Sequence, residues 1–369
     1  MRKKRVAILL HGLGPNGIDT LFANLANEWD YAMFDIIYFL AVDPDNCQYW
    51  EQKVSEAGVR IIHLTDLDGK KILRWPKIFS KALKEYGPFD AVHVNMDMLN
   101  GINLVVAKLN KIPIRICHSH VSGHKLPDNK MKAFLKQIYL LIMRILMGCL
   151  STKRIACSIS AGSYFYGKKD YEVVVNGVDT VKFANAAVNK VPGNGKIRML
   201  TVGRISYPKN PFFMADVVNE MYKRDNCVEF TWVGTGDLEQ DIKQYVSGLE
   251  MKECVNFLGT RSDIAEIMAS SDYFLLPSLY EGLGIVLIEA QASGLMCFVS
   301  DAVPPIVDCG RCKFISLEKG PSEWAQTLLT YIKSGENITL DTKKLNQFDI
   351  GNMARRLEQL YREEHSCNS

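Results

Sequence analysis

Short apolar runs alternate with longer amphipathic stretches along nearly the whole chain, and this alternation constrains the fold more than any other feature. In the first half the runs are VAILL, DIIYFLAV, VRIIHL, DAVHVN, IRICHS, RIACSIS and EVVVN, at 6–10, 35–42, 59–64, 90–95, 114–119, 154–160 and 172–176. In the second half they are IRMLTVG, VEFTWVG, VNFLG, DYFLLP and LMCFVS, at 197–203, 228–234, 255–259, 272–277 and 295–300. Strand-length runs separated by helix-length segments are typical of parallel sheets. The sequence therefore predicts an α/β fold with two doubly wound sheets.

The length of the chain favours two domains. At 369 residues, with 47% hydrophobic and 23% charged residues, it exceeds what one core usually serves and has enough apolar material for two. The polar stretch NAAVNKVPGNGK at 185–196 lacks apolar periodicity and is expected to be the linker. We expect an N-terminal domain at 1–180, a C-terminal domain at 181–345, and a final helix within 346–369 that packs back toward the N-terminal domain.

The ends and the most apolar segment bear on cellular location. The basic start MRKKR precedes an apolar run of only five residues, 6–10, which is too short for a signal peptide. The apolar segment 134–150 is interrupted by Lys136, Gln137 and Arg144, so we expect it to fall short of a membrane span. The ten cysteines show no disulfide framework. A cytoplasmic protein with reduced thiols is expected, and the single CxxC at Cys309 and Cys312 is expected to be structural.

Charge is distributed unevenly although the net charge is only +3. Residues 98–169 carry 12 Lys and Arg and one acid, Asp128. One interpretation is that the basic segment 108–169 contacts an anionic membrane surface, which would place a cytoplasmic protein at the inner face of the cell membrane. The alternative is a core helix with a solvated basic edge. Nucleic-acid binding is not expected, because no recognition motif accompanies the charges. Four aromatic residues are interleaved with the charges: Phe134, Tyr139, Phe165 and Tyr166.

A glycine-rich loop follows the first predicted strand. Gly12, Gly14 and Gly17 spell GxGxxG, the dinucleotide fingerprint, and Asp43 after the second strand could serve as its ribose acid. Pro15 removes one of the N–H donors that would approach a pyrophosphate. Three interpretations stay open: a turn near a phosphate, an NAD site of an oxidoreductase, and a purely structural turn.

The segment EGLGIVLIE at 281–289 places two carboxylates around a glycine-rich turn, between a buried strand and a helix. Glu281 and Glu289 are eight positions apart, slightly over two helical turns, so both could face one cleft. Gly282 and Gly284 allow backbone N–H groups at the helix start to approach a phosphate, whereas carboxylates suit hydroxyl groups. The pattern predicts a ligand that carries both phosphate and hydroxyls.

The loop VGRISYPKN at 202–210 contributes two cations. Arg204 and Lys209 lie five positions apart after a predicted strand, and a planar fork together with a point charge suits a diphosphate. The alternative is a solvated surface pair. Taken alone, these two residues do not decide between the interpretations.

Four motifs of the C-terminal half, taken in order, indicate the function more specifically than any one of them. VGRISYPKN, VGTGDLEQDI, FLGTRSDI and PSLYEGLGIVLIEAQASG follow one another in the order seen in retaining GT-B glycosyltransferases of family 4, which this chain resembles. The first half resembles the family more loosely, through the glycine loop, HSH at 118–120 and VVNGVD at 174–179. The resemblance implies two Rossmann-like domains facing a central cleft. It also implies transfer of a hexose or N-acetylhexosamine from a nucleotide sugar, UDP-linked by expectation, to a glycan or lipid-diphosphate-linked acceptor in exopolysaccharide or capsule synthesis.

The resemblance also assigns roles to residues. Arg204 and Lys209 would hold the donor diphosphate, Glu281 the transferred sugar and Glu289 the ribose. Either His118 or His120 would reach the donor sugar, and because side chains alternate along a strand both lie on one face. The remaining implied substrate contacts are Gly14 and Gly17 in the first glycine loop, Gly203 and Gly234 in later turns, Arg261 near the nucleobase, and the amides of Gly282, Leu283, Gly284 and Ile285.

The resemblance further implies that neither a cofactor nor a metal is needed. No acidic DxD-like pair stands at a strand end, where other glycosyltransferases hold a divalent ion. Two competing functions are an NAD-dependent oxidoreductase that uses the N-terminal GxGxxG, and a non-catalytic glycan-binding or scaffold protein. An oxidoreductase would leave the motifs in the C-terminal half of the chain unexplained. A non-catalytic protein would have no use for the paired cations and acids.

Overall fold

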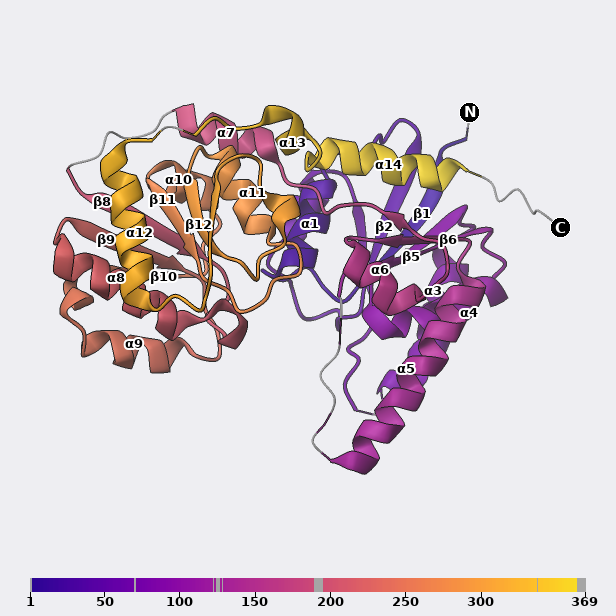
Figure 1. Ribbon diagram of the computed structural model, residues 1–369. Coiled ribbons are helices and arrows are strands. Elements are labelled where there is room, and N and C mark those ends of the chain that lie inside the picture. Colours follow the sequence, from indigo (N-terminus) through magenta and orange to yellow (C-terminus); the bar gives the residue numbers. More distant parts are fainter. Residues whose placement is uncertain are drawn as a thin grey trace. The chain divides into compact units, whose positions relative to one another are not determined.

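The structure is a computed structural model that describes residues 2–69, 71–121, 123, 127, 129–188, 195–336 and 338–363, and the chain divides into two compact units (Figure 1). The first unit runs to Gly177 and takes up the chain again at Ile350, and the second runs from Val178 to Asp349. These limits lie close to the expected ones at 180/181 and 345/346. The final helix, α14 (Ile350–Arg362), belongs to the first unit.

The expected linker at 185–196 does not separate the units. Asn185 to Val188 complete helix α7 (Thr180–Val188), which belongs to the second unit, and residues 189–194 lie outside the described residues. Buried Phe183 anchors this helix while Asn185 is exposed, so one apolar residue suffices where the sequence shows little periodicity. The expectation was wrong because a short surface helix with a single anchor resembles a polar linker in sequence.

The first unit contains a seven-stranded parallel sheet in the order β3-β2-β1-β4-β5-β6-β7. Alternate residues of β1 enter different cores: Val6 and Ile8 face α1 and α14, whereas Ala7 and Leu9 face α3, α4 and α5. The sheet is therefore covered on both faces, as a parallel sheet requires. Its strands are β1 (Lys4–Leu10), β2 (Phe34–Leu40), β3 (Arg60–His63), β4 (Ala91–Val94), β5 (Ile114–Ser119), β6 (Lys153–Ala156) and β7 (Glu172–Val173). Its other helices are α1 (Gly17–Leu25), α2 (Glu51–Glu56), α3 (Lys71–Tyr86), the 3-10 helix η1 (Asp97–Leu99), α4 (Asn100–Leu109), α5 (Lys130–Leu150) and α6 (Ile159–Tyr166).

The second unit contains a six-stranded parallel sheet in the order β10-β9-β8-β11-β12-β13. One core joins this sheet to α8, α9 and α12 through Trp232, Met214 and Trp324, while α7 packs against α10 and α11. The strands are β8 (Ile197–Val202), β9 (Val228–Val233), β10 (Val255–Gly259), β11 (Tyr273–Leu276), β12 (Met296–Ser300) and β13 (Cys312–Ile315). The helices after α7 are α8 (Pro211–Arg224), α9 (Glu239–Ser247), α10 (Ile264–Ala269), α11 (Ile285–Ala292), α12 (Pro321–Ser334) and α13 (Thr342–Asn346), with 3-10 helices η2 (Tyr207–Lys209), η3 (Glu250–Cys254) and η4 (Pro305–Val307).

The predicted α/β class with two doubly wound sheets is confirmed, and a strand overlaps each of the twelve predicted runs. Two runs are shorter than expected. In RIACSIS the strand stops at Ala156, because Ser158 caps α6 by accepting a hydrogen bond from the Ala161 amide. In EVVVN only Glu172 and Val173 pair. Strand β13 was not predicted.

Both sheets reverse their strand order at one place. In the first unit β1 and β4 are neighbours, and in the second β8 and β11 are neighbours, with crossovers leading in opposite directions from each pair. Open α/β sheets bind ligands in the crevice at the carboxyl ends of such neighbouring strands. The loops that follow these four strands are therefore where a ligand site is expected.

Candidate functional site

Two loops meet at the reversal point of the second sheet. One follows β8 and contains Lys209, and the other follows β11 and contains Glu281. A backbone hydrogen bond of 2.8 Å from the Leu279 amide to the Pro208 carbonyl joins them. The predicted motifs RISYPKN and PSLYEGLG thus lie side by side, although 72 positions separate Lys209 in the first from Glu281 in the second.

Lys209 and Glu281 form an ion pair across this junction. The Lys209 ammonium donates to Glu281 Oε1 over 2.6 Å, and Ser278 Oγ donates to the same oxygen over 2.6 Å. The Lys209 and Glu281 side chains are 22% and 9% exposed. An ammonium has three donors and a carboxylate about four acceptor positions, so each keeps capacity for a ligand. The pair can hold an anionic group and a hydroxyl group next to each other.

The start of α11 adds backbone donors to the same loop. Gly284 precedes the helix in a left-handed conformation (φ 74°, ψ 48°), which favours glycine. Among the described residues, no hydrogen bond takes up the amides of Gly282, Leu283, Gly284 or Ile285. Free amides at a helix N-terminus, where the helix dipole is positive, favour an anion such as a phosphate.

Glu289 lies on α11 itself, whereas Glu281 lies in the loop before it. The two acids thus lie on either side of the glycine-rich turn at the start of α11, as the sequence predicts, and the helix begins at Ile285. Burial raises the pKa of the Glu289 carboxyl to about 7, and Lys182 on α7 offsets part of the rise. Its carboxylate makes no hydrogen bond to the residues that the structure describes. A half-buried acid without a hydrogen-bond donor suits a ligand that brings hydroxyl groups.

The two arginines predicted for the site are less closely held. Arg204 is exposed, and none of the described residues forms an ion pair with its guanidinium. Arg261 is exposed and pairs with Asp263 through two hydrogen bonds of 2.7 and 2.5 Å. The structure therefore brings Lys209, Glu281 and the α11 amides together, and leaves Arg204 on the Lys209 loop and Arg261 with its own neighbour.

Gly203 and Gly234 allow the backbones of two loops to approach closely. A Cβ atom at Gly234 would lie 2.1 Å from the Gly203 carbonyl oxygen, and both residues have positive φ (129° and 151°). The Gly203 amide donates to Val233 over 2.9 Å, which fixes the β8 loop to β9. These glycines shape the loop that carries Lys209.

Substituting Gly234 by alanine is expected to destabilise the protein by about 2–4 kcal/mol, because the new methyl group collides with backbone and the backbone conformation is strained. Gly282 is the matched control, since a Cβ there meets nothing within 4 Å and its φ is not positive. Gly282→Ala is expected to change stability by less than about 0.5 kcal/mol. Urea denaturation followed by circular dichroism compares the two, and equal midpoints would contradict the close approach.

In the glycine loop of the first unit, side chains of the protein already form the hydrogen bonds that a ligand would need. The Gly14 amide and the Asn16 amide group donate to Asp19 Oδ2 over 2.8 and 2.6 Å, and Asn16 caps α1. Burial raises the pKa of Asp19 to about 6. A carboxylate of the protein therefore already accepts the amide that a pyrophosphate would need in the GxGxxG interpretation. The roles of Gly14 and Gly17 in binding acceptor stay predictions.

Asp43, the expected ribose acid of an NAD site, is likewise engaged. Lys71 and Thr65 donate to its carboxylate over 2.5 and 3.0 Å, and the Asp66 amide donates over 3.1 Å. The Lys71 ammonium holds the pKa of Asp43 well below its usual range. The arrangement gives the oxidoreductase alternative no support.

Three histidines of the first unit are adjacent in the sheet. His93 on β4 contacts His118 on β5 over 3.2 Å, and the rings of His118 and His120 have centroids 3.9 Å apart. The shared face of His118 and His120 was expected, because side chains alternate along a strand. Burial lowers the pKa of His93 to about 3 and that of His120 to about 4, and it lowers the pKa of His118 strongly. All three are neutral at physiological pH.

His118 and His120 differ in exposure. His118 has no exposed surface, whereas His120 is partly exposed just beyond the end of β5. His120 Nε2 donates to Asn95 Oδ1 over 3.1 Å, which leaves Nδ1 as an acceptor. Three buried polar atoms have no hydrogen-bond partner among the described residues of this region: His118 Nε2, His120 Nδ1 and Asn176 Oδ1.

Sequence reasoning missed two residues of this cluster. His93 lies inside an apolar run, and Tyr361 on α14 contacts its Nδ1 over 2.8 Å although 268 positions separate them. The run DAVHVN could have signalled His93, because a histidine within a buried strand needs a polar partner. No sequence signal points to Tyr361.

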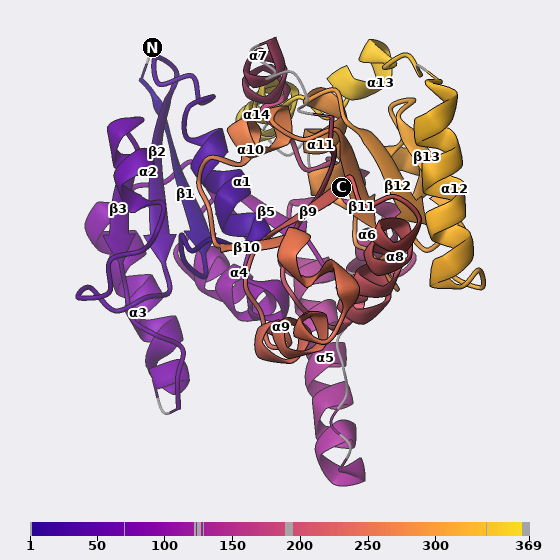
Figure 2. The same cartoon turned by 90° about the vertical axis from the view of Figure 1, so that its left-hand side faces the viewer.

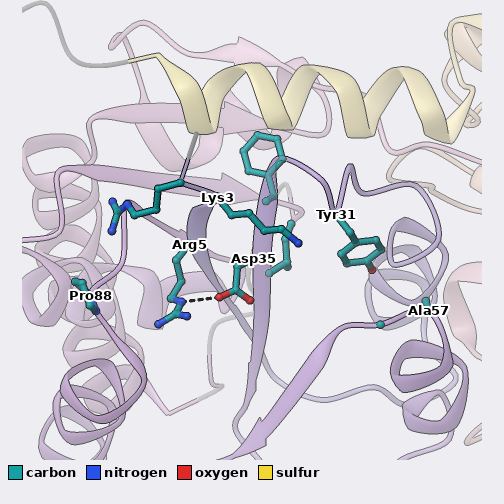
Figure 3. Close-up of a pocket in the computed structure, with 10 residues that line it drawn as sticks. Lys3, Arg5, Tyr31, Asp35, Ala57 and Pro88 are labelled. Atoms are coloured by element: carbon teal, nitrogen blue, oxygen red, sulfur yellow. Dashed lines mark hydrogen bonds and ion pairs between the residues drawn. The ribbon is translucent and has the colours of Figure 1, made fainter.

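A pocket lies at the opposite end of the first sheet (Figure 3). It has a volume of about 750 Å³ and is lined where β1 and β2 begin, by Arg5, Tyr31 and Asp35 among others. Arg5 pairs with Asp35 over 2.6 Å inside it, and the two side chains point toward each other in Figure 3. Its position at the amino ends of the strands separates it from the ligand end of the sheet.

Within the described ranges, no group of three or more His, Cys, Asp or Glu side chains is placed to hold a metal ion. The cysteines of these ranges are free thiols, including Cys309 and Cys312. The expected independence from metal and cofactor stays a prediction.

A family match covers the part of the chain that contains the Lys209 and Glu281 loops. Residues 196–334 match the family described as glycosyl transferases group 1. EpsF of Bacillus subtilis (strain 168), which is assigned to the glycosyltransferases, is 32% identical over 349 residues and covers 90% of this chain and 89% of its own. The UDP-Gal:alpha-D-GlcNAc-diphosphoundecaprenol alpha-1,3-galactosyltransferase of Escherichia coli is 31% identical over 230 residues, 58% of each chain.

A solved structure shows the same fold. Alr3699/HepE of Anabaena in complex with UDP superposes with a TM-score of 0.76 at 17% identity, over 96% of this chain and 98% of that chain. The identity and coverage of EpsF, together with the family match over the second sheet, establish the family. The chain belongs to the group 1 glycosyltransferases and has their GT-B type of fold.

Proposed function

We propose that the protein is a retaining, metal-independent glycosyltransferase that moves a hexosyl or N-acetylhexosaminyl group from a UDP-linked donor to a glycan or lipid-diphosphate-linked acceptor. The observation that carries the proposal is the Lys209–Glu281 ion pair beside the free amides of α11, at the reversal point of the second sheet. Cation, amides and carboxylate there match the diphosphate and hydroxyl groups of a glycosyl nucleotide. The reaction belongs to exopolysaccharide or capsule synthesis in the cytoplasm.

The reaction depends mainly on stabilising the negative charge that develops on the departing diphosphate. Lys209 and the amides of Gly282 to Ile285 would stabilise it, together with Arg204, which is exposed on the same loop as Lys209. Glu281 would accept hydrogen bonds from the transferred sugar, and Glu289 from the ribose. Arg261 would lie beside the nucleobase, with its pairing to Asp263 keeping the loop in shape.

The proposed route to retention of configuration is attack from the face that the diphosphate leaves. The bond from the anomeric carbon to the phosphate oxygen breaks, the bond to the acceptor oxygen forms on the same face, and the acceptor proton passes to the leaving phosphate. No protein base is needed for this proton transfer. The neutral state of His118 and His120 is consistent with a role in contacting the sugar rather than in carrying charge.

Two similarities support the choice of donor and acceptor. The Anabaena structure holds UDP, and the name of the Escherichia coli relative specifies a UDP-linked donor and a diphosphoundecaprenol acceptor. Both concern those proteins, so donor and acceptor need a direct test. Purified protein is expected to be stabilised by UDP: a ligand at 100 times its Kd adds about 2.7 kcal/mol. Because 1 kcal/mol shifts the Tm of a domain of this size by about 2–4 °C, the Tm should rise by roughly 5–11 °C.

NAD is the discriminating control in this thermal shift. Stabilisation by NAD and not by UDP would favour the oxidoreductase instead. A screen of nucleotide sugars for slow hydrolysis then names the donor, and hydrolysis or transfer of any of them excludes a non-catalytic scaffold.

The two histidines are expected to separate into a structural and a sugar-contacting residue. His118→Ala removes a fully buried ring and is expected to lower stability by about 2–4 kcal/mol. His120→Ala is expected to cost less than about 1 kcal/mol in stability but to lower kcat/KM at least about tenfold, the equivalent of one hydrogen bond to the sugar. Denaturation midpoints and donor turnover distinguish them. Full activity of His120→Ala would remove His120 from the site.

A further inference from the structure

Helix α5 is the longest helix among the described residues and is unusually exposed. It connects β5 to β6, which are hydrogen-bonded parallel neighbours. Only one narrow stripe of it is buried, formed by Leu140, Met143, Met147 and Gly148, and it packs against α4. Its N-terminal half extends past the neighbouring helices of the first unit in both views (Figure 1, Figure 2). The rest of its surface therefore needs another explanation than core packing.

The outward face of α5 is entirely apolar. Successive outward residues recur three or four positions apart, so they form one continuous face at 100° per residue. Their exposed fractions reach 67% for Met131 and 58% for Phe134 and Leu141. A face of this size is uncommon on the surface of a soluble protein and marks an interaction site. The face consists of Met131, Phe134, Leu135, Ile138, Leu141, Ile142 and Ile145.

The charges on α5 are all of one sign. Lys130, Lys132, Lys136 and Arg144 are its ionisable basic residues, and the helix has no acid. At 100° per residue, Lys130 and Lys132 flank the outward face on opposite sides. Arg144 lies on the inner side, over the Tyr164 ring at 4.2 Å. Apolar residues bordered by exposed lysines suit the boundary between lipid chains and anionic headgroups.

Part of the earlier membrane hypothesis needs correction. Phe165 and Tyr166 are buried in the core, whereas Phe134 and Tyr139 on α5 are exposed. The expectation that segment 134–150 falls short of a membrane span stays a prediction, although α5 has the length and composition of a span, with a mean hydropathy of 1.7. One such helix is weak evidence for a span, and only 22% of its most apolar window is buried.

We propose that α5 is a membrane-docking helix that lies in the plane of an anionic bilayer surface and inserts its outward apolar face. The inner stripe stays packed on α4, and both ends stay joined to neighbouring strands of one sheet. Crossing the bilayer would tear α5 from that sheet, so the in-plane position is the one that the fold permits. The proposal rests on α5 alone and holds whichever donor the enzyme uses.

A second copy of the chain fits this face less well than lipid. Two α5 helices packed through their apolar faces would bring lysines together, and α5 supplies no acid to meet them. The wider segment 98–169 has the same bias, with 12 basic residues and the single acid Asp128. An anionic lipid surface satisfies both the apolar and the basic groups.

Cosedimentation of the full chain with phosphatidylglycerol-rich vesicles tests the proposal. Ile145→Glu is expected to weaken binding at least tenfold, because it places a carboxylate in the inserted face. Ile306→Glu in the second unit is the matched control, since the two isoleucines are 53% and 59% exposed, and its binding should stay within twofold of wild type. Binding of Ile145→Glu equal to wild type overturns the proposal, as does equal binding to phosphatidylcholine vesicles at low salt.

The depth to which α5 inserts into the bilayer, and the oligomeric state of the protein, are measured on the wild type and on single-residue variants. Ile138→Trp is expected to show fluorescence quenching by lipids brominated near the headgroup, and alkaline carbonate is expected to release the bound protein. Retention after carbonate, or quenching only by lipids brominated at the chain ends, contradicts the in-plane helix. A soluble dimer that Ile145→Glu dissociates, without vesicle binding by wild type, assigns the face to a second copy instead.

Discussion

Replacing Lys209 with alanine is expected to lower donor turnover by about 10²–10³-fold, the usual effect of removing one group that stabilises developing negative charge. The substitution removes the cation beside the departing diphosphate. It also leaves Glu281, 9% exposed, with Ser278 as its one remaining hydrogen-bond donor among the residues that the structure describes. Steady-state hydrolysis of the nucleotide sugar measures the loss, which is expected mainly in kcat.

A surface ion pair of equal length is the control for this substitution. Lys243 donates to Glu239 over 2.6 Å, the distance found between Lys209 and Glu281, but lies on the exposed side of α9. Lys243→Ala is expected to leave turnover within about twofold of wild type, because exposed pairs contribute little. Comparable losses in both variants would mean that the Lys209 effect arises from lost stability. Unchanged turnover in Lys209→Ala would end the diphosphate assignment.

Replacing Glu289 with glutamine is expected to weaken UDP binding by about 10–100-fold and to leave kcat close to wild type. The change keeps the size of the side chain but removes the charged acceptor for two ribose hydroxyls, each hydrogen bond to a charged group being worth about 1.5–3 kcal/mol. Isothermal titration with UDP measures it. Glu266→Gln, an exposed glutamate on α10, is the control and should bind as wild type does. An unchanged Kd in Glu289→Gln would contradict the ribose role.

The raised pKa of Glu289 adds a pH dependence to this prediction. The pKa is about 7 in the folded protein against an ordinary value of 4.5. Below pH 4.5 the carboxyl is protonated in both states and has no effect. As the pH rises from 4.5 to about 7, the unfolded chain ionises first, so the free energy of unfolding falls, by at most about 3 kcal/mol.

Glu289→Gln is expected to remove this fall, while UDP affinity of the wild type rises through pH 7 as the carboxylate forms. The difference between the two proteins at each pH isolates Glu289 from Asp19, whose pKa of about 6 acts in the same direction. Identical stability profiles of wild type and Glu289→Gln between pH 4.5 and 7 would show that burial does not perturb this acid.

The sheets could be predicted from sequence because buried parallel strands are nearly continuous apolar runs. The missed strand β13 reads CKFI and has only Ile315 fully buried, so its composition gives no such signal. The linker prediction failed at Asn185 to Val188 for the converse reason, since Phe183 is the one buried apolar residue of α7 and gives no periodic signal. At α5 the sequence left two interpretations open, a membrane-contacting segment and a core helix with a solvated basic edge, and the structure leaves the apolar face uncovered.

The candidate site was predictable only as a set of loops. Each motif indicates phosphate or hydroxyl binding by its residue types, but the contact between Lys209 and Glu281 depends on β8 and β11 being neighbours, which no spacing reveals. The order of four motifs supplied that information through the family resemblance. Contacts such as His93 with Tyr361 depend on α14 returning to the first sheet, and they carry no motif.

The most direct test of the account is a crystal structure of the protein with UDP. We expect the diphosphate within hydrogen-bond distance of Lys209 Nζ and of amides between Gly282 and Ile285, with both ribose hydroxyls donating to the Glu289 carboxylate. UDP bound at the Gly14 loop of the first unit, or with its ribose turned away from Glu289, would contradict the account.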